Sequence, residues 1–342
     1  MLDEKRSGAN LKDSQELKLV QLSEIEAEEV EWLWYPFIPF GKITLLQGDP
    51  GCGKTFLILK LIALLTRGLS LPECKGEPLP PFNVIYQTAE DGIADTIKPR
   101  LEQAGADCEK VFVIDESKNP LSFVDARIEQ AIIQQKARLL ILDPLQAYLG
   151  EMVDMNQSNK VRPQFARLAG IAERTGCSII LIGHLNKKEG TKDLYRALGS
   201  IDIAAAVRSV LLVTEAMENR GRKVMLQLKN NLAPMCPGIE FELGEAVHFL
   251  GYTDIPTDTF LKGMEKLQEK SQAEKFNKAL KRIPEILSEQ ADLRMPSTEI
   301  IQRLVDEGIG KRTADKAKKE LNVLSVKEDN IWYWYLDHPA ES

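Results

Sequence analysis

The sequence predicts an α/β fold, in which a mainly parallel sheet with helices on both faces is followed by a small helix-turn-helix module. Apolar β-like runs alternate with helical stretches between residues 43 and 184, which is the pattern of a parallel sheet. Shorter β-like runs then follow one another as far as residue 250, which favours an antiparallel extension on one sheet edge. After residue 256 the composition changes and a charged helical stretch begins.

The composition is that of a globular protein, and its 342 residues suit one large domain with an appendage. Hydrophobic residues make up 44%, enough for a sizeable core, so global disorder is excluded. The formal net charge of −7 excludes a uniformly basic nucleic-acid coat, although a local basic patch could still bind a phosphate backbone.

Cysteine usage and the start of the chain indicate a cytoplasmic protein. Five cysteines without a C-x-x-C pair argue against a zinc site or a disulfide framework and favour a reducing compartment. The first residues contain no apolar segment typical of a signal peptide. No segment reaches the roughly 20 apolar residues needed to span a bilayer, so we expect no membrane partner.

Each predicted strand is a short, mostly apolar run, and the helical stretches between the first strands show the spacing of apolar residues typical of helices. The predicted parallel strands are 43–47, 84–88, 111–114, 139–143 and 179–184, with helices near 54–67, 92–104, 124–136 and 158–175. The predicted antiparallel strands are 207–214, 223–229, 239–243 and 247–250. We expect four segments along the chain: an N-terminal arm (1–30), the α/β domain (31–256), a linker helix (257–282) and a C-terminal module (283–342).

A phosphate-binding loop follows the first predicted strand. Residues 48–55 match G-x-x-x-x-G-K-[ST] between an apolar strand and an apolar helix, the context that supports this motif. Glycines let backbone N–H groups close around a triphosphate at a helix N-terminus. Lys54 is expected to reach the β- and γ-phosphates of a nucleotide such as ATP, and Thr55 to bind Mg²⁺. The predicted nucleotide-binding residues are Gly48, Asp49, Pro50, Gly51, Cys52, Gly53, Lys54 and Thr55.

Two carboxylates at strand ends complete the predicted catalytic centre. Asp143 ends a buried strand in the Walker B pattern, where the acid holds Mg²⁺ through water; helix capping is its alternative role. Proline follows it instead of glutamate, so the base that activates the attacking water must come from elsewhere. Glu90 is the predicted base, because it follows a neighbouring strand whose end meets the same crevice. Asp91 is the second choice, and a plain surface turn is the alternative.

His184 and Arg208 are the remaining catalytic candidates. His184 ends the strand beside the Walker B strand, where it could hydrogen-bond the γ-phosphate and report its loss, although a histidine there is often structural. Arg208 interrupts an apolar run, and a buried unpaired charge is costly. It therefore either pairs internally or emerges at a subunit boundary as an arginine finger. Weaker candidates for that boundary are Arg100, Arg196 and Lys229.

In this order the motifs resemble the RepA-type branch of the RecA-like ATPases of plasmids, phages and other mobile elements. The matching stretches are GDPGCGKT, TAEDG with the following IKPRL, LLILDPLQAYL, ILIGHLNK and YRALGSIDIAAAVRSVLLV. The resemblance implies a RecA-like P-loop fold, ATP and Mg²⁺ as ligands, and a ring, usually a hexamer, with nucleotide between subunits. By motif match it makes Glu90 the base, His184 the sensor and Arg208 the arginine that acts on the neighbouring subunit. It also implies helicase-like activity on DNA.

The resemblance further implies two loops that face the ring channel and touch single-stranded DNA, here roughly 146–162 and 186–196. The second loop is basic, as a loop that follows a phosphate backbone should be. Stacking candidates are Tyr148 and Tyr195, and solvated surface loops are the alternative. The predicted DNA-binding residues of this loop are Lys187, Lys188, Lys192 and Arg196.

The C-terminal module has the pattern of a winged helix-turn-helix. A helix with Ser297 as its N-cap ends near Gly308, a basic helix follows over 311–321, and a hairpin is expected over 324–336. On the basic helix, Ala314, Ala317 and Leu321 share one face, and Trp332 and Trp334 of the hairpin are interpreted as core residues. The opposite, basic face carries the predicted duplex-DNA contacts Arg312, Lys316 and Lys319, with protein docking as the alternative role.

Together these observations favour an oligomeric ATPase that moves on or remodels DNA, with helicase-like activity. The alternative is a DNA-binding regulator or loader of a mobile element in which ATP controls assembly without unwinding. A small-molecule kinase is disfavoured, because the chain has no evident Arg-rich lid and carries a DNA-binding-like C-terminal module.

Overall fold

The computed structural model describes residues 19–74, 76–150, 158–184, 201–217, 219, 221–290 and 292–336. Among them, nine strands form one large sheet in the order β11-β10-β9-β8-β3-β7-β6-β4-β5. The six strands from β8 to β5 are parallel, which confirms the predicted fold class. Their bounds are β3 Ile43–Gly48, β4 Val84–Thr88, β5 Val111–Phe112, β6 Leu139–Asp143, β7 Ser178–His184 and β8 Ser209–Glu215.

The antiparallel part continues the sheet beyond β8, as the sequence predicts for the runs between 223 and 250. The run 207–214, predicted as antiparallel, is β8, which pairs in parallel with β3 and antiparallel only with β9. Its strands are β9 Arg222–Asn230, β10 Ile239–Leu243 and β11 Val247–Tyr252. A short hairpin of β1 Trp32–Trp34 and β2 Ile38–Pro39 precedes the sheet, and the sequence reasoning missed it. The prolines and aromatic residues of this segment do not show the alternation that identifies a strand.

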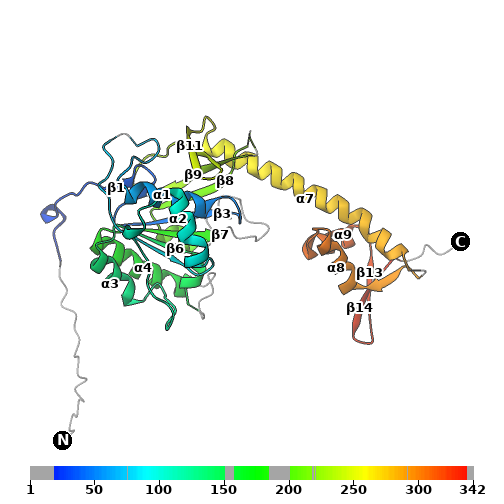
Figure 1. The fold of residues 1–342 in the computed structure, drawn as a ribbon. Coiled ribbons are helices and arrows are strands. Elements are labelled where there is room, and N and C mark those ends of the chain that lie inside the picture. Colours follow the sequence, from blue (N-terminus) through cyan, green and yellow to red (C-terminus); the bar gives the residue numbers. More distant parts are fainter. Residues whose placement is uncertain are drawn as a thin grey trace, which may run out of the picture.

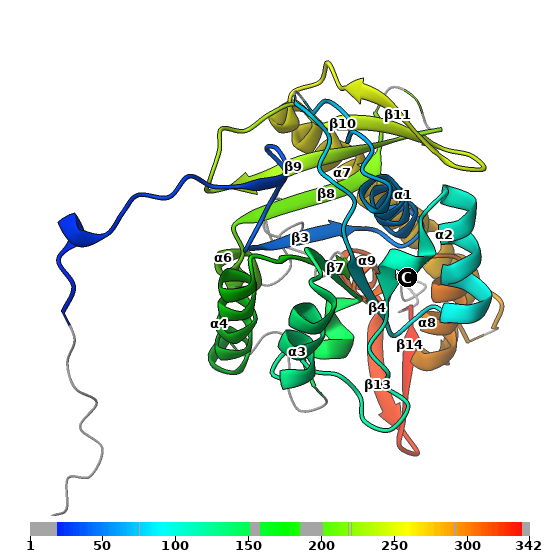
Figure 2. The same cartoon turned by 60° about the vertical axis from the view of Figure 1, so that its left-hand side comes forward.

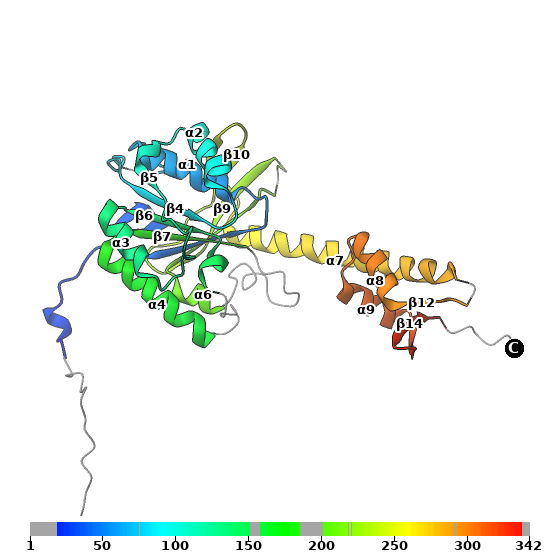
Figure 3. The same cartoon turned by 60° about the horizontal axis from the view of Figure 1, so that its bottom comes forward.

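Helices cover both faces of the sheet (Figures 2 and 3). Neighbouring residues of one strand belong to opposite cores. Leu46 packs with Ile58 of α1 and Leu101 of α2, whereas Leu45 packs with Ile128 of α3 and others on the opposite face. The helix bounds are α1 Lys54–Thr66, α2 Lys98–Ala104, α3 Ala126–Gln135, α4 Ser158–Thr175 and α6 Ile201–Ala206. The predicted helix over 92–104 is instead a π-helical turn, Ile93–Ile97, that leads into α2.

A single helix of 32 residues, α7 (Thr257–Ser288), leads from the sheet to a C-terminal unit (Figure 1). It is longer than the predicted 257–282 and continues through Pro284. Apolar residues of its last turns, including Ala279, Ile283 and Leu287, belong to the core of the C-terminal unit. The boundary predicted at 282/283 therefore falls inside a helix that contributes to both segments.

The C-terminal unit combines two helices with a three-stranded antiparallel sheet in the order β12-β14-β13. Pro296 holds the cap position of α8 and Ser297 is its first residue, without a side-chain cap, so the predicted N-cap role of Ser297 is wrong. Strand β12 was missed because it has only three residues. The bounds are β12 Arg294–Pro296, α8 Ser297–Asp306, α9 Lys311–Glu320, β13 Leu324–Glu328 and β14 Ile331–Tyr335.

Candidate active site

The predicted phosphate loop joins the carboxyl end of β3 to the first turn of α1. Gly53 precedes Lys54 with a φ of 96°, a left-handed conformation that glycine adopts without strain. A β-carbon on Gly48 would lie 2.4 Å from the carbonyl oxygen of Val213, so only glycine fits there. The glycines of the motif are therefore required by the path of the backbone, which brings N–H groups to the start of a helix.

Lys54 is held inside this loop. Its side chain is 6% exposed, and Nζ donates hydrogen bonds to the carbonyl oxygens of Gly48 (2.9 Å) and Asp49 (3.0 Å). Nζ also lies 3.8 Å from Sγ of Cys52. Burial raises the pKa of the Cys52 thiol above its usual range, and the nearby Lys54 charge only partly offsets this. Cys52 is thus a buried thiol that stays neutral.

Asp143 lies at the end of β6 and is 6% exposed. The phenolic O–H of Tyr86, on the adjacent strand β4, donates a hydrogen bond of 3.1 Å to its Oδ2. Burial raises the pKa of Asp143, the hydrogen bond from Tyr86 lowers it, and the charge of Glu90 raises it again. The carboxylate is therefore costly to ionise without a nearby cation. Tyr86 is a site residue that sequence reasoning missed, because its phenol is on an apolar strand and its partner is 57 residues away.

Glu90 and His184 come together although 94 residues separate them. His184 ends β7 in register with Gly48 of the phosphate loop, and its Nε2 lies 3.4 Å from Oε1 of Glu90. Nδ1 of His184 is buried and has no hydrogen-bond partner among the described residues. The Glu90 side chain is 56% exposed, so its carboxylate is open to water. Thr88 Oγ1 accepts hydrogen bonds from the backbone N–H groups of Glu90 and Asp91, which fixes their turn.

Arg208 lies at the amino ends of the parallel strands, whereas the phosphate loop lies at their carboxyl ends. Its backbone N–H donates to the carbonyl oxygen of Ile43, at the start of β3, whereas the phosphate loop follows the end of that strand. A six-residue strand separates the two ends by about 16 Å. Arg208 is exposed, and its guanidinium takes part in no ion pair found among the described residues. Its charge nevertheless helps to lower the pKa of Glu173. These observations disfavour a buried internal pair.

The basic loop predicted to contact single-stranded DNA, with Lys187, Lys188, Lys192 and Arg196, lies outside the described residues. Tyr148, a predicted stacking residue of the other loop, is 1% exposed. Its ring stacks on Phe123, with the centroids 6.3 Å apart. The stacking prediction for Tyr148 is therefore wrong, because the short helical turn that carries it points the ring into the core.

The basic helix of the C-terminal unit, α9, has the predicted two faces. Arg312, Lys316 and Lys319 are exposed, whereas Ala314 and Ala317 are buried. The helix packs on α7, where the Lys316 ammonium lies 5.1 Å from the centre of the Phe276 ring. Lys316 therefore interacts with the protein itself. The sequence-based prediction treats the three cations as equivalent DNA contacts.

The two tryptophans of the hairpin have different environments, although both face the same side of β14. Trp334 is 4% exposed in the core of the unit, but Trp332 is 53% exposed. Trp332 is paired with Lys327 near the hairpin turn, whereas Trp334 is paired with Met295 of β12. The core interpretation is correct for Trp334 and wrong for Trp332.

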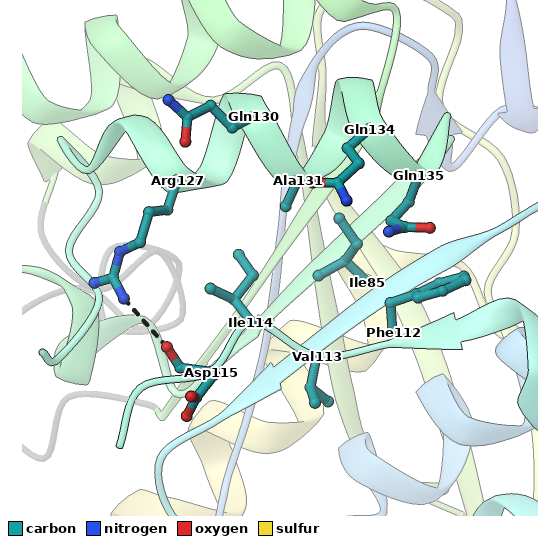
Figure 4. Close-up of a pocket in the computed structure, with 10 residues that line it drawn as sticks. All are labelled: Ile85, Phe112, Val113, Ile114, Asp115, Arg127, Gln130, Ala131, Gln134 and Gln135. Carbon is teal, nitrogen blue, oxygen red and sulfur yellow. Dashed lines mark hydrogen bonds between the residues drawn. The ribbon is translucent and has the colours of Figure 1, made fainter. Parts of the chain in front are cut away.

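A pocket of about 340 Å³ lies at the far edge of the sheet, between α3 and the segment that includes β5 (Figure 4). Arg127 closes one end by donating a 3.2 Å hydrogen bond to the carbonyl oxygen of Asp115. None of the predicted site residues lines this pocket. Its lining residues are Ile85, Phe112, Val113, Ile114, Asp115, Arg127, Gln130, Ala131, Gln134 and Gln135.

Comparison with known proteins places this geometry in a family. The profile of the AAA domain matches residues 9–190, more than half of the chain. The chain belongs to the AAA domain family. Together with the sheet order and the phosphate loop, this confirms the predicted RecA-like P-loop ATPase class. The RepA-type branch stays a prediction.

Several curated relatives resemble this AAA domain protein. The DNA repair protein RadA of Halalkalibacterium halodurans is 31% identical over 150 residues, which cover 43% of this chain and 29% of the relative. RadA of Escherichia coli K12 is 24% identical over 187 residues, covering 50% and 35%. Protein RecA of Aquifex pyrophilus is 25% identical over 228 residues, covering 61% of each. The chain thus spans less than a third of the length of the first of these relatives.

Within the residues that the structure describes, no helix is long and apolar enough to cross a membrane. The same part of the chain holds no group of three or more His, Cys, Asp or Glu side chains that could bind a metal by themselves. A divalent cation at Asp143 would therefore need further ligands from Thr55, water or nucleotide phosphates, which is how Mg²⁺ is usually held.

Proposed function

We propose that this AAA domain protein binds and hydrolyses ATP with Mg²⁺ at the carboxyl edge of its parallel sheet. The observation that carries the proposal is the convergence, at that edge, of the buried Lys54 ammonium, the buried Asp143 carboxylate and the Glu90–His184 pair. The residues fit these ligands. Gly48 and Gly53 leave no room for a side chain, so only the backbone of the loop lies at these positions. Asp143 is a buried acid whose ionised form a cation would stabilise.

The roles follow from the chemistry of each group. Backbone N–H groups of the loop 48–55, except at Pro50, bind the phosphates, and Lys54 exchanges its carbonyl partners for phosphate oxygens. Thr55 and Asp143 would hold Mg²⁺, Asp143 through water, and the cation would neutralise charge on the phosphates. Glu90 accepts the proton of the attacking water, because its carboxylate is exposed beside the loop. His184, which reaches Glu90 through Nε2, links that carboxylate to the strand beside the phosphate loop.

Arg208 completes the site of a neighbouring subunit. It is too far from its own phosphate loop, and it presents an exposed guanidinium at the other edge of the sheet. An arginine placed in this way stabilises transition-state charge only when a second copy supplies the phosphate loop. The proposal therefore includes an oligomer, of which a hexameric ring is the form implied by the RepA-type resemblance.

DNA is the proposed substrate of this motor. The RadA relatives are named as DNA repair proteins, and α9 carries exposed cations in a unit with two helices and a hairpin. We propose that this unit is a winged helix-turn-helix that contacts duplex DNA, and that the loop 186–196 contacts single-stranded DNA in a channel. The protein is then a helicase-like or DNA-remodelling ATPase. The alternative is an ATP-controlled DNA-binding regulator or loader, which strand displacement on a forked duplex distinguishes.

The test of the ATPase proposal is steady-state phosphate release by the wild-type chain and by Lys54→Ala. The variant loses the only side-chain cation of the loop, so we expect hydrolysis to fall by about 10³-fold or more and nucleotide binding to weaken. Lys60→Ala is the matched control, because Lys60 lies on the same helix but outside the loop. Near wild-type turnover by Lys54→Ala would contradict the proposal.

A further inference from the structure

Arg100, a weaker candidate for the subunit boundary, contacts both halves of the proposed active site within its own chain. It lies on α2, and its Nη1 is 3.4 Å from Oδ2 of Asp91. The same guanidinium lies over the ring of Phe56, 5.2 Å from its centre. Asp91 follows the proposed base Glu90, and Phe56 follows Thr55, the proposed Mg²⁺ ligand. Arg100 therefore joins the turn that carries the base to the helix that begins at the phosphate loop.

The segment between Asp91 and Arg100 gives this contact a rigid frame. The carbonyl oxygen of Gly92 accepts hydrogen bonds from the N–H groups of Thr96 (3.2 Å) and Ile97 (3.0 Å), which closes a π-helical turn. Such turns occur often at functional sites.

The helix that carries Arg100 is anchored in the core. Ile97, just before α2, and Leu101, within it, are only 2% and 4% exposed. Both belong to the apolar cluster that also contains residues of α1. The base itself has few restraints, since the described contacts of Glu90 are its N–H bond to Thr88 and its approach to His184. The Arg100–Asp91 ion pair thus restrains the turn from a fixed helix, immediately beside an exposed carboxylate.

We propose that Arg100 is a positioning residue for hydrolysis, which holds the Asp91 turn against α1 so that Glu90 stays aligned with the phosphate loop. The proposal rests on the proposed ATPase function. Arginine suits this role better than lysine, because its planar group pairs with a carboxylate and stacks on an aromatic ring at the same time. Its half-buried position, with a side chain 35% exposed, lets both contacts coexist.

The test compares kcat, KM and ATP affinity of Arg100→Gln and Arg100→Lys in the full chain. A shift of the base by about 1 Å costs up to 10²-fold in rate, so we expect kcat of Arg100→Gln to fall by about 10- to 100-fold. ATP affinity should stay within about twofold, because the binding groups are unchanged, and Arg100→Lys should recover part of the rate through the ion pair. Lys98→Gln is the control, since Lys98 is on the same helix and its described ion pair is with Glu102, at 3.9 Å.

A double-mutant cycle separates positioning from a general loss of structure. If Arg100 acts through Asp91, the Arg100→Gln loss should shrink in an Asp91→Asn background. Equal losses in both backgrounds would overturn the proposal, as would an unchanged kcat in Arg100→Gln. If Arg100→Gln is destabilised in thermal unfolding, Phe56→Leu tests the same frame and should also lower kcat more than it weakens binding.

Mixing with Lys54→Ala protomers tests whether Arg100 acts within its own subunit. A protomer with Arg100→Gln keeps an intact phosphate loop, so a neighbour's Arg100 would rescue it only if this arginine worked across the interface. We expect no rescue, and recovery of activity would overturn the positioning role. Failure of the ATPase proposal itself would look different, since the wild-type chain would then show no Lys54-dependent hydrolysis at all.

Discussion

The phosphate-loop edge of the sheet and the C-terminal unit present their candidate residues in opposite ways. At the sheet edge Lys54 and Asp143 are 6% exposed and have fixed hydrogen-bond partners, Lys54 within its own loop and Asp143 on the adjacent strand. On α9, Arg312 and Lys319 are exposed charges of a single helix. Buried groups with one geometry give large losses when changed, whereas exposed charges act through screened, additive electrostatics. The two regions should therefore respond to mutation in different ways, sharply at the sheet edge and gradually on α9.

The largest effect is expected from Glu90→Gln, which keeps the shape of the side chain but removes its ability to accept a proton. Turnover should fall by about 10²–10⁴-fold while ATP still binds, and single-turnover hydrolysis with a nucleotide-binding assay measures both. Asp91→Asn is the comparison variant, and its turnover should fall less, because it loses the ion pair with Arg100 but keeps the Glu90 carboxylate. If Asp91→Asn produced the loss and Glu90→Gln did not, the base would be Asp91.

Arg208→Ala should slow hydrolysis by about 10³-fold without unfolding the subunit, because the arginine is exposed and remote from its own site. Mixing it with Lys54→Ala should restore part of the activity, since each mixed interface can combine two intact halves. Hydrolysis across mixing ratios measures the recovery. Its absence, with mixed assembly confirmed by mass measurement, would show that the sheet edge is complete within one subunit.

On α9 the expected effect is graded. Removing one phosphate contact should lower the slope of log affinity against log salt by about 0.9, so Arg312→Glu and Lys319→Glu together should lower it by about 1.8. The measurement is a salt titration of the full chain on duplex DNA, with Lys270→Glu on α7 as control. The full chain is needed because Phe276 and Ala279 of α7 contribute to the core of the C-terminal unit. Protein docking would be favoured if duplex binding by the wild-type chain did not depend on salt and if the two substitutions left that binding unchanged.

The smallest effect concerns stability. Burial raises the pKa of Asp143 in the folded protein above its unfolded value, so ionised Asp143 destabilises the nucleotide-free fold at neutral pH. This cost disappears as the pH falls through the folded pKa. Asp143→Asn should therefore raise the unfolding temperature at pH 7, and the gain should vanish at low pH; thermal unfolding across pH measures it. An unfolding temperature lowered at pH 7 would indicate that Asp143 is stabilised by a partner in the free protein.

Local patterns were sufficient for the elements of the sheet. The predicted strands 84–88, 139–143 and 239–243 have the observed bounds, because an apolar run between polar punctuation is visible within a few residues. The phosphate-loop motif is equally local, since it lies between one strand and one helix, and Gly51 and Gly53 adopt the left-handed φ values that this turn needs. Prediction failed where the context is not local. The ring of Tyr148 stacks on Phe123 in the core, and one helix carries the chain past the predicted boundary at 282/283.

The sequence by itself determined the parallel α/β class, the loop that would bind phosphate and the candidate acids at strand ends, because each depends on short-range spacing and backbone geometry. Only the tertiary structure decided which side chains meet. It joined His184 to Glu90, Tyr86 to Asp143 and Arg100 to both Asp91 and Phe56. It also put Arg208 at the opposite edge from the loop, just before a strand that runs parallel to β3. Strand adjacency is set by packing of the whole sheet, so no short segment of sequence contains this information.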